Sequence, residues 1–274
     1  MSACAARQPE GYNAGAMSLH ILSLETSGSR CGVALLRERA GHVDILLREH
    51  EGVAEHSARL LPMVDSVLAE AGLSRDAIDA VAFGQGPGGF TGLRVACGVA
   101  QGMGYALDIP VLPIVSNAAV EHQLPADAAA LRIVALDARM DETYLAVYRR
   151  DGAPVQVQSP VLIAVADVAP WIDSRVSGWL GRDASLAGLG DDELLVAGDV
   201  FRHDAEPKEP LSRFAWRQVL RPDARAVAWL GLAAWQAGQA LSPEQARPLY
   251  VRDKVAFTTR EREQGAGGNP RAGA

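Results

Sequence analysis

Apolar and polar positions in the N-terminal part of the chain follow the short period of β-strands. Three apolar-rich runs at 19–25, 31–37 and 43–50 are separated by short turns at 26–29 and around Ala40-Gly41. Runs of this length bounded by Gly, Ser and Thr are typical of strands, and tight connections join antiparallel neighbours. This part of the chain therefore predicts an antiparallel meander of three strands.

The period then lengthens to that of an amphipathic helix. Between 57 and 71 the apolar residues fall on one stripe: Leu60, Leu61, Val64, Val67, Leu68 and Ala71. Beyond Gly72, strands are expected at 78–83 and 111–115, and helices are expected at 91–107 and from Ser116 onward. A meander followed by two right-handed crossovers is the order of a ribonuclease-H-like unit.

A second, weaker copy of this pattern follows. Strands are expected at 131–137, 142–149, 155–163 and 193–197, and helices at 165–174 and 221–240. Segments 173–192 and 202–210 are interpreted as surface connections. Two such units in tandem predict an α/β, actin-like (ASKHA) fold with two ribonuclease-H-like lobes, each a mixed sheet flanked by helices.

Four segments follow from this pattern. Residues 1–17 and 261–274 are expected to be disordered extensions, because they lack apolar periodicity. Residues 18–122 form the first lobe, and residues 123–260 form a smaller second lobe whose C-terminal helix is a candidate to pack back on the first. Either Met1 or Met17 is the natural start.

Composition narrows the class of protein. The net charge is −7, and the only lysines are Lys208 and Lys254. Without a basic cluster the chain is not expected to bind nucleic acid on its own, although a partner could supply that surface. Three scattered cysteines favour a reduced, cytoplasmic setting, and no apolar run is long enough to span a membrane.

One stretch is unusually rich in glycine, the loop that runs from Gly84 to Arg94. It connects an expected strand to an expected helix and reads Gly86, Pro87, Gly88, Gly89, Phe90, Thr91, Gly92, Leu93 and Arg94. Such a turn suits an anion, because its backbone N–H groups are accessible. It matches neither the Walker nor the dinucleotide-binding spacing, so the ligand stays open.

Acidic residues end the first strand of each expected lobe. Glu25-Thr26 and Asp137 stand where actin-like ATPases hold phosphate and metal. Glutamate is one methylene longer than aspartate, and no glycine turn follows Asp137, so we interpret both carboxylates as hydrogen-bonding nearby turn amides. None of the six histidines forms a metal-binding pair at helical spacing, so no metal site is predicted.

The helix after Arg94 carries three interior glycines, Gly98, Gly102 and Gly104. Together they cost on the order of 2–3 kcal/mol of helix stability relative to alanine. Close approach of another backbone would offset this cost. That backbone belongs either to the chain's own sheet or 57–71 helix, or to another subunit.

These residues resemble the TsaB family, the dimerisation subunit of the bacterial tRNA threonylcarbamoyladenosine machinery. The loop Gly86–Arg94 is similar to the family's Gly-Pro-Gly-Ser-Phe-Thr-Gly-x-Arg signature. Further matches in order are Glu25-Thr26, the helix start from His56 to Pro62, Leu136–Arg139 and the Pro248–Arg252 tail. Gly89 replaces a common Ser and Glu25 replaces a common Asp, which weakens a ligand role at both.

The resemblance implies a non-catalytic protein that pairs with the catalytic subunit TsaD, joined by the ATPase TsaE. It implies support of threonylcarbamoyl transfer to the adenosine beside the tRNA anticodon, with tRNA contacted mainly through the complex. No cofactor of its own is expected, and a nucleotide at the partner interface stays open. Arg94 is expected to anchor the glycine loop.

The expected partner interface combines the 57–71 helix and the helix after Arg94. Its residues are Leu60, Met63, Val64, Val67, Gly98, Gly102 and Ala106. Two other hypotheses remain: an autonomous actin-like ATPase, kinase or glycoprotease-like hydrolase, and a homodimer without another partner.

Overall fold

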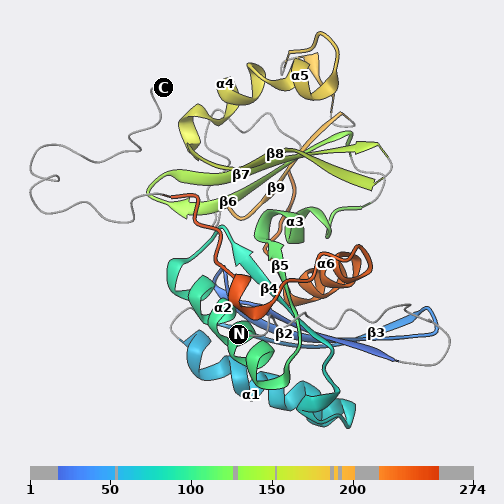
Figure 1. Ribbon diagram of the computed structural model, residues 1–274. Coiled ribbons are helices and arrows are strands. Elements are labelled where there is room, and N and C mark those ends of the chain that lie inside the picture. The colour runs from blue at the N-terminus through green and yellow to red at the C-terminus, as the bar shows by residue number, and fades with distance from the viewer. Residues whose placement is uncertain are drawn as a thin grey trace, which may run out of the picture. The chain divides into compact units, whose positions relative to one another are not determined.

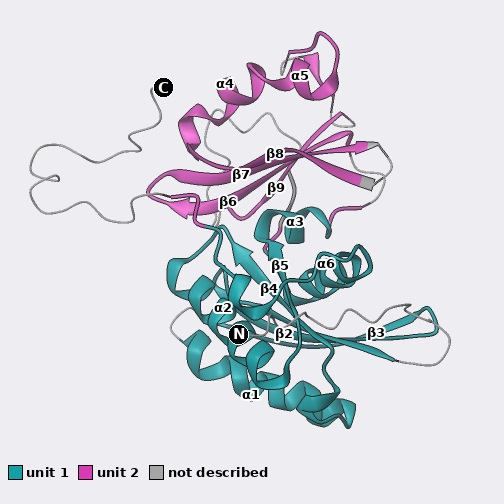
Figure 2. Cartoon of the chain, in the orientation of Figure 1, with its two compact units in different colours: residues 1–123, 222–249 teal, residues 124–221, 250–274 magenta. Residues whose placement is uncertain are grey.

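The computed structural model describes residues 18–52, 55–125, 129–151, 153–185, 188–190, 193–200 and 216–252. The predicted extensions at 1–17 and 261–274, the start at Met17 and the 202–210 connection lie outside these residues. The chain divides into two compact units, residues 1–123 with 222–249 and residues 124–221 with 250–274 (Figure 2).

Unit 1 is built on a five-stranded mixed sheet in the order β3-β2-β1-β4-β5 (Figure 1). The strands are β1 (Leu19–Glu25), β2 (Arg30–Arg39), β3 (His42–Glu51), β4 (Ala80–Gly86) and β5 (Val111–Val115). The first three are antiparallel, as the meander predicted, whereas β4 and β5 run parallel to β1.

Helices cover both faces of this sheet. They are α1 (His56–Ala71), α2 (Phe90–Leu107), α3 (Ser116–Glu121) and α6 (Ala224–Gln236), with short 3-10 turns at Arg75–Ala77 and Pro243–Gln245. Leu22 and Leu24 join a buried cluster with α1 and α2, whereas Ile21 joins one with α6. The alternation along β1 follows from the two-residue period of a strand buried on both faces.

Helix α6 is distant in sequence from the sheet that it covers. The sequence placed it in the 123–260 lobe, as a candidate to pack on the first. In the structure Ser23 Oγ donates to the Ala224 carbonyl, and a Cβ on Gly231 would lie 2.8 Å from the Ala82 side chain. The close backbone approach at Gly231 fixes α6 on unit 1.

Unit 2 repeats the same topology, in the order β10-β9-β6-β7-β8. Its elements are β6 (Leu131–Arg139), β7 (Glu142–Asp151), β8 (Ala153–Ala164), a 3-10 turn (Val165–Asp167), α4 (Val168–Asp173), α5 (Val176–Leu180), β9 (Leu194–Gly198) and β10 (Trp216–Val219). The strands β6, β7 and β8 are antiparallel, and β9 runs parallel to β6. The predicted α/β fold with two ribonuclease-H-like lobes is confirmed.

One local expectation in unit 2 was wrong, and one strand was not predicted. The stretch 173–192 is not only a surface connection, because it contains α5, whose Trp179 packs in the core against Trp171 at a ring-centroid distance of 5.5 Å. The strand β10 was missed, because its four residues offer no periodic signal.

Candidate functional site

Glu25 lies at the carboxyl end of β1, sealed from solvent. Its side chain is 1% exposed, and Oε1 accepts a hydrogen bond from the Ser27 backbone N–H at 2.5 Å. The other oxygen, Oε2, has no hydrogen-bond partner among the described residues and lies against Gly84, where a Cβ would be 2.0 Å away. This carboxylate is therefore enclosed by its own chain.

Burial dominates the electrostatics of Glu25. Desolvation raises the pKa of its carboxyl to about 7, because the charged form loses its hydration. Hydrogen bonds from Ser27 oppose the rise, and the negative charge of Asp223 adds to it. A carboxyl in this state is poorly suited to hold a divalent cation, which needs ionised and accessible oxygens.

The glycine loop closes onto the turn that follows Glu25. The Gly89 N–H donates to the Ser27 carbonyl at 2.7 Å, and Thr26 Oγ1 donates to the Gly92 carbonyl at 2.7 Å. A Cβ on Gly92 would lie 1.8 Å from the Thr26 carbonyl oxygen, and one on Gly88 would lie 2.5 Å from that of Ser27. These glycines are therefore explained by backbone packing against the turn, and the loop is not an open anion cradle.

Residues near the C-terminal end of unit 1 cover the start of the loop. The Leu249 N–H donates to the Gln85 carbonyl at 2.6 Å, and Gly86, at φ +111°, has the Leu249 carbonyl 2.9 Å from its Cβ position. The Arg94 guanidinium stacks 3.7 Å above the centre of the Phe90 ring. Thr91, which lies between Phe90 and Arg94 in the sequence, is exposed on the first turn of α2.

In unit 2, Asp137 occupies the position that corresponds to the end of β1. Its Oδ1 accepts the Arg139 N–H at 2.7 Å, and its own N–H donates to Asp199 at 3.0 Å. The interpretation that both strand-end carboxylates bond to turn amides is confirmed, since Glu25 and Asp137 each accept the N–H two residues further on.

Arg252, the last residue of the Pro248–Arg252 tail, has clear contacts in the structure. Its guanidinium lies 2.6 Å from the Glu142 carboxylate, with side chains only 12% and 8% exposed, and donates to the Ala138 carbonyl at 2.9 Å. No local pattern indicated this, because the partners are more than a hundred residues apart.

The outer face of α2 carries the glycines that sequence reasoning singled out. Gly98, Gly102 and Ala106 are exposed, and among the described residues no atom beyond the adjoining helix backbone lies within 4 Å of a Cβ built on either glycine. Gly104 differs, because its Cβ would be 2.7 Å from the Pro243 side chain. Packing within the chain thus explains Gly104 and leaves the other two unexplained.

The expectation that α1 would present its apolar stripe to a partner was wrong for three residues. Leu60, Val64 and Val67 are at most 1% exposed and belong to the core beneath α1 and α2. Met63 is half-buried against the same core. The stripe faces the chain's own sheet, because an isolated lobe must bury it there.

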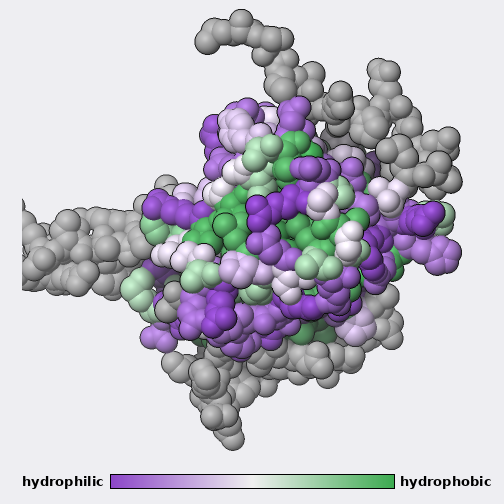
Figure 3. All heavy atoms as spheres, turned by 90° about the horizontal axis from the view of Figure 1, so that it is seen from below, coloured by the Kyte–Doolittle hydropathy of each residue, from purple (hydrophilic) through white to green (hydrophobic). Residues whose placement is uncertain are grey.

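A smaller apolar surface remains on the outside of α1. Leu61 is 46% exposed, and its neighbours Ala58 and Pro62 are exposed as well. Figure 3, which views the molecule from the side where α1 lies in Figure 1, shows hydrophobic residues gathered among hydrophilic ones. Single exposed apolar residues are common on protein surfaces, so this surface alone does not indicate a binding site.

Replacing Gly102 with alanine should stabilise the isolated protein by about 1 kcal/mol, because the new methyl group meets open space and an interior helix glycine is unfavourable. Chemical denaturation measures the change. The matched control is Gly104→Ala, whose methyl would collide with Pro243 and should give no gain. Equal changes in both variants would contradict this account of the two glycines.

Within the described ranges, no group of three or more His, Cys, Asp or Glu side chains is placed to hold a metal ion. None of the helices in those ranges has the length and apolarity that crossing a membrane requires.

Two ribonuclease-H-like units, each with a first strand that ends in a carboxylate bonded to its own turn, define an actin-like α/β fold. The family model "TsaD: tRNA N6-adenosine threonylcarbamoyltransferase" matches residues 47–258. A Haemophilus influenzae protein, "tRNA threonylcarbamoyladenosine biosynthesis protein TsaB", is 40% identical over 88% of this chain and 96% of its own. The chain belongs to the TsaB family.

Other comparisons agree. The Escherichia coli protein with the same name is 28% identical, over 87% of this chain and 97% of its own length. The solved structure "YeaZ from Pseudomonas aeruginosa" matches with a TM-score of 0.66 and 31% identity, covering 85% of this chain and 99% of that one.

Proposed function

We propose that this protein is a non-catalytic subunit that binds a TsaD-type catalytic subunit. In that complex it supports threonylcarbamoyl transfer to the adenosine adjacent to the tRNA anticodon. The names of two relatives support a role in tRNA threonylcarbamoyladenosine biosynthesis. The observation that carries the docking role is the outward face of α2, where none of the described residues packs on Gly98 or Gly102 closely enough to offset their cost in helix stability.

A helix face of glycine and alanine allows another helix to approach closely. Gly98, Gly102 and Ala106 are four residues apart along α2 and are all exposed, so they form one smooth strip. Tyr105, 59% exposed beside this strip, and Leu61 on α1 would add apolar area. We propose that this surface, rather than the buried stripe of α1, contacts the catalytic subunit.

The chemistry of the strand-end residues supports a non-catalytic role. Glu25 is enclosed and accepts the Ser27 N–H of its own turn, and the Gly89 N–H of the glycine loop donates to the Ser27 carbonyl. An autonomous ATPase, kinase or hydrolase would need these groups to be available. No cofactor of its own is proposed.

The same proposal assigns the other partners. A TsaE-type ATPase would join the complex, and tRNA would be contacted mainly through the partners, since the chain carries a net charge of −7. The strip on α2 is also available to a second copy of this chain, so a homodimer would compete with the complex.

Replacing Gly102 with leucine should weaken binding to the TsaD-type subunit by about 10-fold or more, because the side chain separates two closely packed helices. Calorimetric titration of the two purified proteins measures it. Gly178→Leu is the matched control, because Gly178 is also exposed on a helix with open space around it and lies on α5. Unaltered affinity in a folded Gly102→Leu variant would rule out this surface.

A further inference from the structure

The turn between β6 and β7 has an unfavourable backbone. Arg139, Met140 and Asp141, together called the Met140 tip here, have φ values of +65°, +55° and +55°. This left-handed region is disfavoured for residues with a Cβ, and methionine has no short polar side chain that could offset the cost by bonding to the nearby backbone. Glycine or asparagine would relieve the strain in a two-residue hairpin turn.

Another hairpin in the chain makes a comparable turn with small residues. The β2–β3 connection uses Ala40 at φ +51° and Gly41 at φ +81°. The Met140 tip instead places a large apolar side chain at its apex. Met140 is 65% exposed, the highest value among the large apolar residues that the structure describes.

Contacts from separate parts of unit 2 hold the strained tip in place. Asp137 accepts the Arg139 N–H, and the Val165 N–H donates to the Asp141 carbonyl at 2.8 Å. The buried Arg252–Glu142 ion pair secures the start of β7 directly after the tip. A strained turn persists when its surroundings over-determine it, and such turns are concentrated at functional positions.

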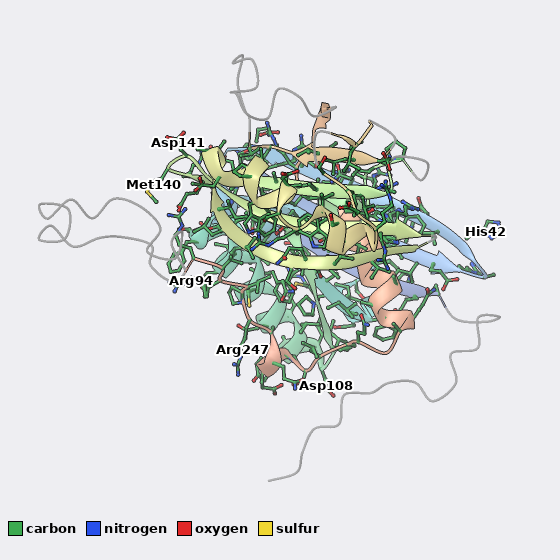
Figure 4. All side chains as sticks on the ribbon, turned by 90° about the horizontal axis from the view of Figure 1, so that it is seen from above. His42, Arg94, Asp108, Met140, Asp141 and Arg247 are labelled. Carbon is green, nitrogen blue, oxygen red and sulfur yellow. The ribbon has the colours of Figure 1, made fainter. Side chains whose placement is uncertain are left out.

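The side chains of Met140 and Asp141 point away from the β6–β7 hairpin. Figure 4 shows Met140 and Asp141 extending outward from the end of the hairpin. Arg139 is 73% exposed and pairs with Asp137 at 3.2 Å. The result is an exposed methionine on a backbone turn that several contacts hold in place, flanked by charges of both signs, which is a pre-organised position for an anchor in binding.

We propose that the Met140 tip is a second docking element, through which Met140 enters an apolar pocket on the TsaD-type catalytic subunit. This inference rests on the proposed function. Methionine adapts to irregular apolar pockets and is enriched in protein interfaces. The tip carries Arg139, paired with Asp137, and Asp141, so its charges are mixed and it lacks the basic cluster that binds a phosphate backbone, which favours a protein over tRNA as the occupant.

The size of the α2 strip supports the need for a second contact. A stable interface buries about 800 Å² on each partner. Glycine and alanine supply little of that area, and the large exposed apolar residues on α1 and α2 are Leu61, Phe90 and Tyr105. A rigid anchor elsewhere on the chain would add affinity at small entropic cost.

The test compares Met140→Gly with Ala40→Gly. Both variants relieve a positive φ, so both should raise the melting temperature, by roughly 2–4 °C. Binding to the TsaD-type subunit, measured by calorimetric titration, should weaken by about 10-fold for Met140→Gly and stay unchanged for Ala40→Gly. Greater stability with weaker binding is the signature of an anchor kept for a partner.

Other outcomes overturn the inference. If the wild type binds the catalytic subunit and Met140→Gly binds equally well, the Met140 tip is not a docking element and the proposed function stands. If the wild type does not bind, the proposed function fails and this inference fails with it. Loss of self-association in Met140→Gly, with unchanged binding to the catalytic subunit, would make a second copy the occupant and overturn the proposed assignment.

Discussion

Replacing Gly92 with alanine is expected to destabilise the protein by about 3 kcal/mol or more, or to prevent folding. A methyl group at this position would lie 1.8 Å from the Thr26 carbonyl oxygen, and backbone stands on both sides of the contact. Relief requires separating the glycine loop from the Thr26–Ser27 turn, which also breaks the bond from Thr26 Oγ1 to the Gly92 carbonyl. Chemical denaturation gives the loss directly.

Gly89→Ala is the matched control in the same loop. A Cβ on Gly89 would lie 3.4 Å from the Ser27 carbonyl oxygen, an ordinary contact, and its φ of −63° suits any residue. The Gly89 N–H that bonds to Ser27 is retained. This variant should change stability by less than about 0.5 kcal/mol. If Gly92→Ala were equally mild, the loop would not be packed as described.

Replacing Glu25 with glutamine is expected to stabilise the protein at pH 8 by about 3 kcal/mol, with little change at pH 4.5. The pKa of Glu25 is about 7 in the folded protein against an ordinary value of 4.5. The folded state therefore holds this proton more tightly than the unfolded state. Its stabilising effect is complete below pH 4.5 and is lost as the pH rises to about 7, where ionisation opposes burial.

Glutamine removes this titration and keeps an oxygen for the Ser27 N–H. Denaturant titrations of wild type and variant at several pH values between 4.5 and 8 measure the difference in their free energies of unfolding. The contributions of other titrating groups are the same in both proteins and drop out of this difference. A difference in stability that does not grow with pH would show that Glu25 is accessible and ionised. The strand end would then be free to take part in binding a cation.

Periodicity was enough to predict most of the fold. The alternation in β1 and the helical stripe of α1 are local signals, and each lobe must bury them in a sheet covered by helices. The same signal misled the interface prediction. The positions of Leu60, Val64 and Val67 show which face of the helix is apolar. In this chain that face is buried in the chain's own core, so it is not available to a partner.

The structure contributed what depends on long-range contact. The sequence shows that the Gly86–Gly92 segment is unusual, but its partner, the Thr26–Ser27 turn, lies more than sixty residues away. Arg252 and Glu142 are likewise distant in sequence. The strain of the Met140 tip was also hidden, because Arg139 and Met140 are not residue types that favour positive φ.

The interior glycines of α2 needed both the sequence and the structure to interpret. Their cost in helix stability is evident from the sequence, and the structure separates Gly104, which packs on Pro243, from Gly98 and Gly102, which face outward. A family relationship to TsaB then gives the outward face a proposed partner.

The most direct test is a reconstituted tRNA modification reaction with the TsaD-type and TsaE-type subunits, assayed for threonylcarbamoyladenosine with and without this protein. We expect product only when the protein is present, and less product when Gly102→Leu replaces the wild type. Equal product in its absence would contradict the account of this chain as a required docking subunit.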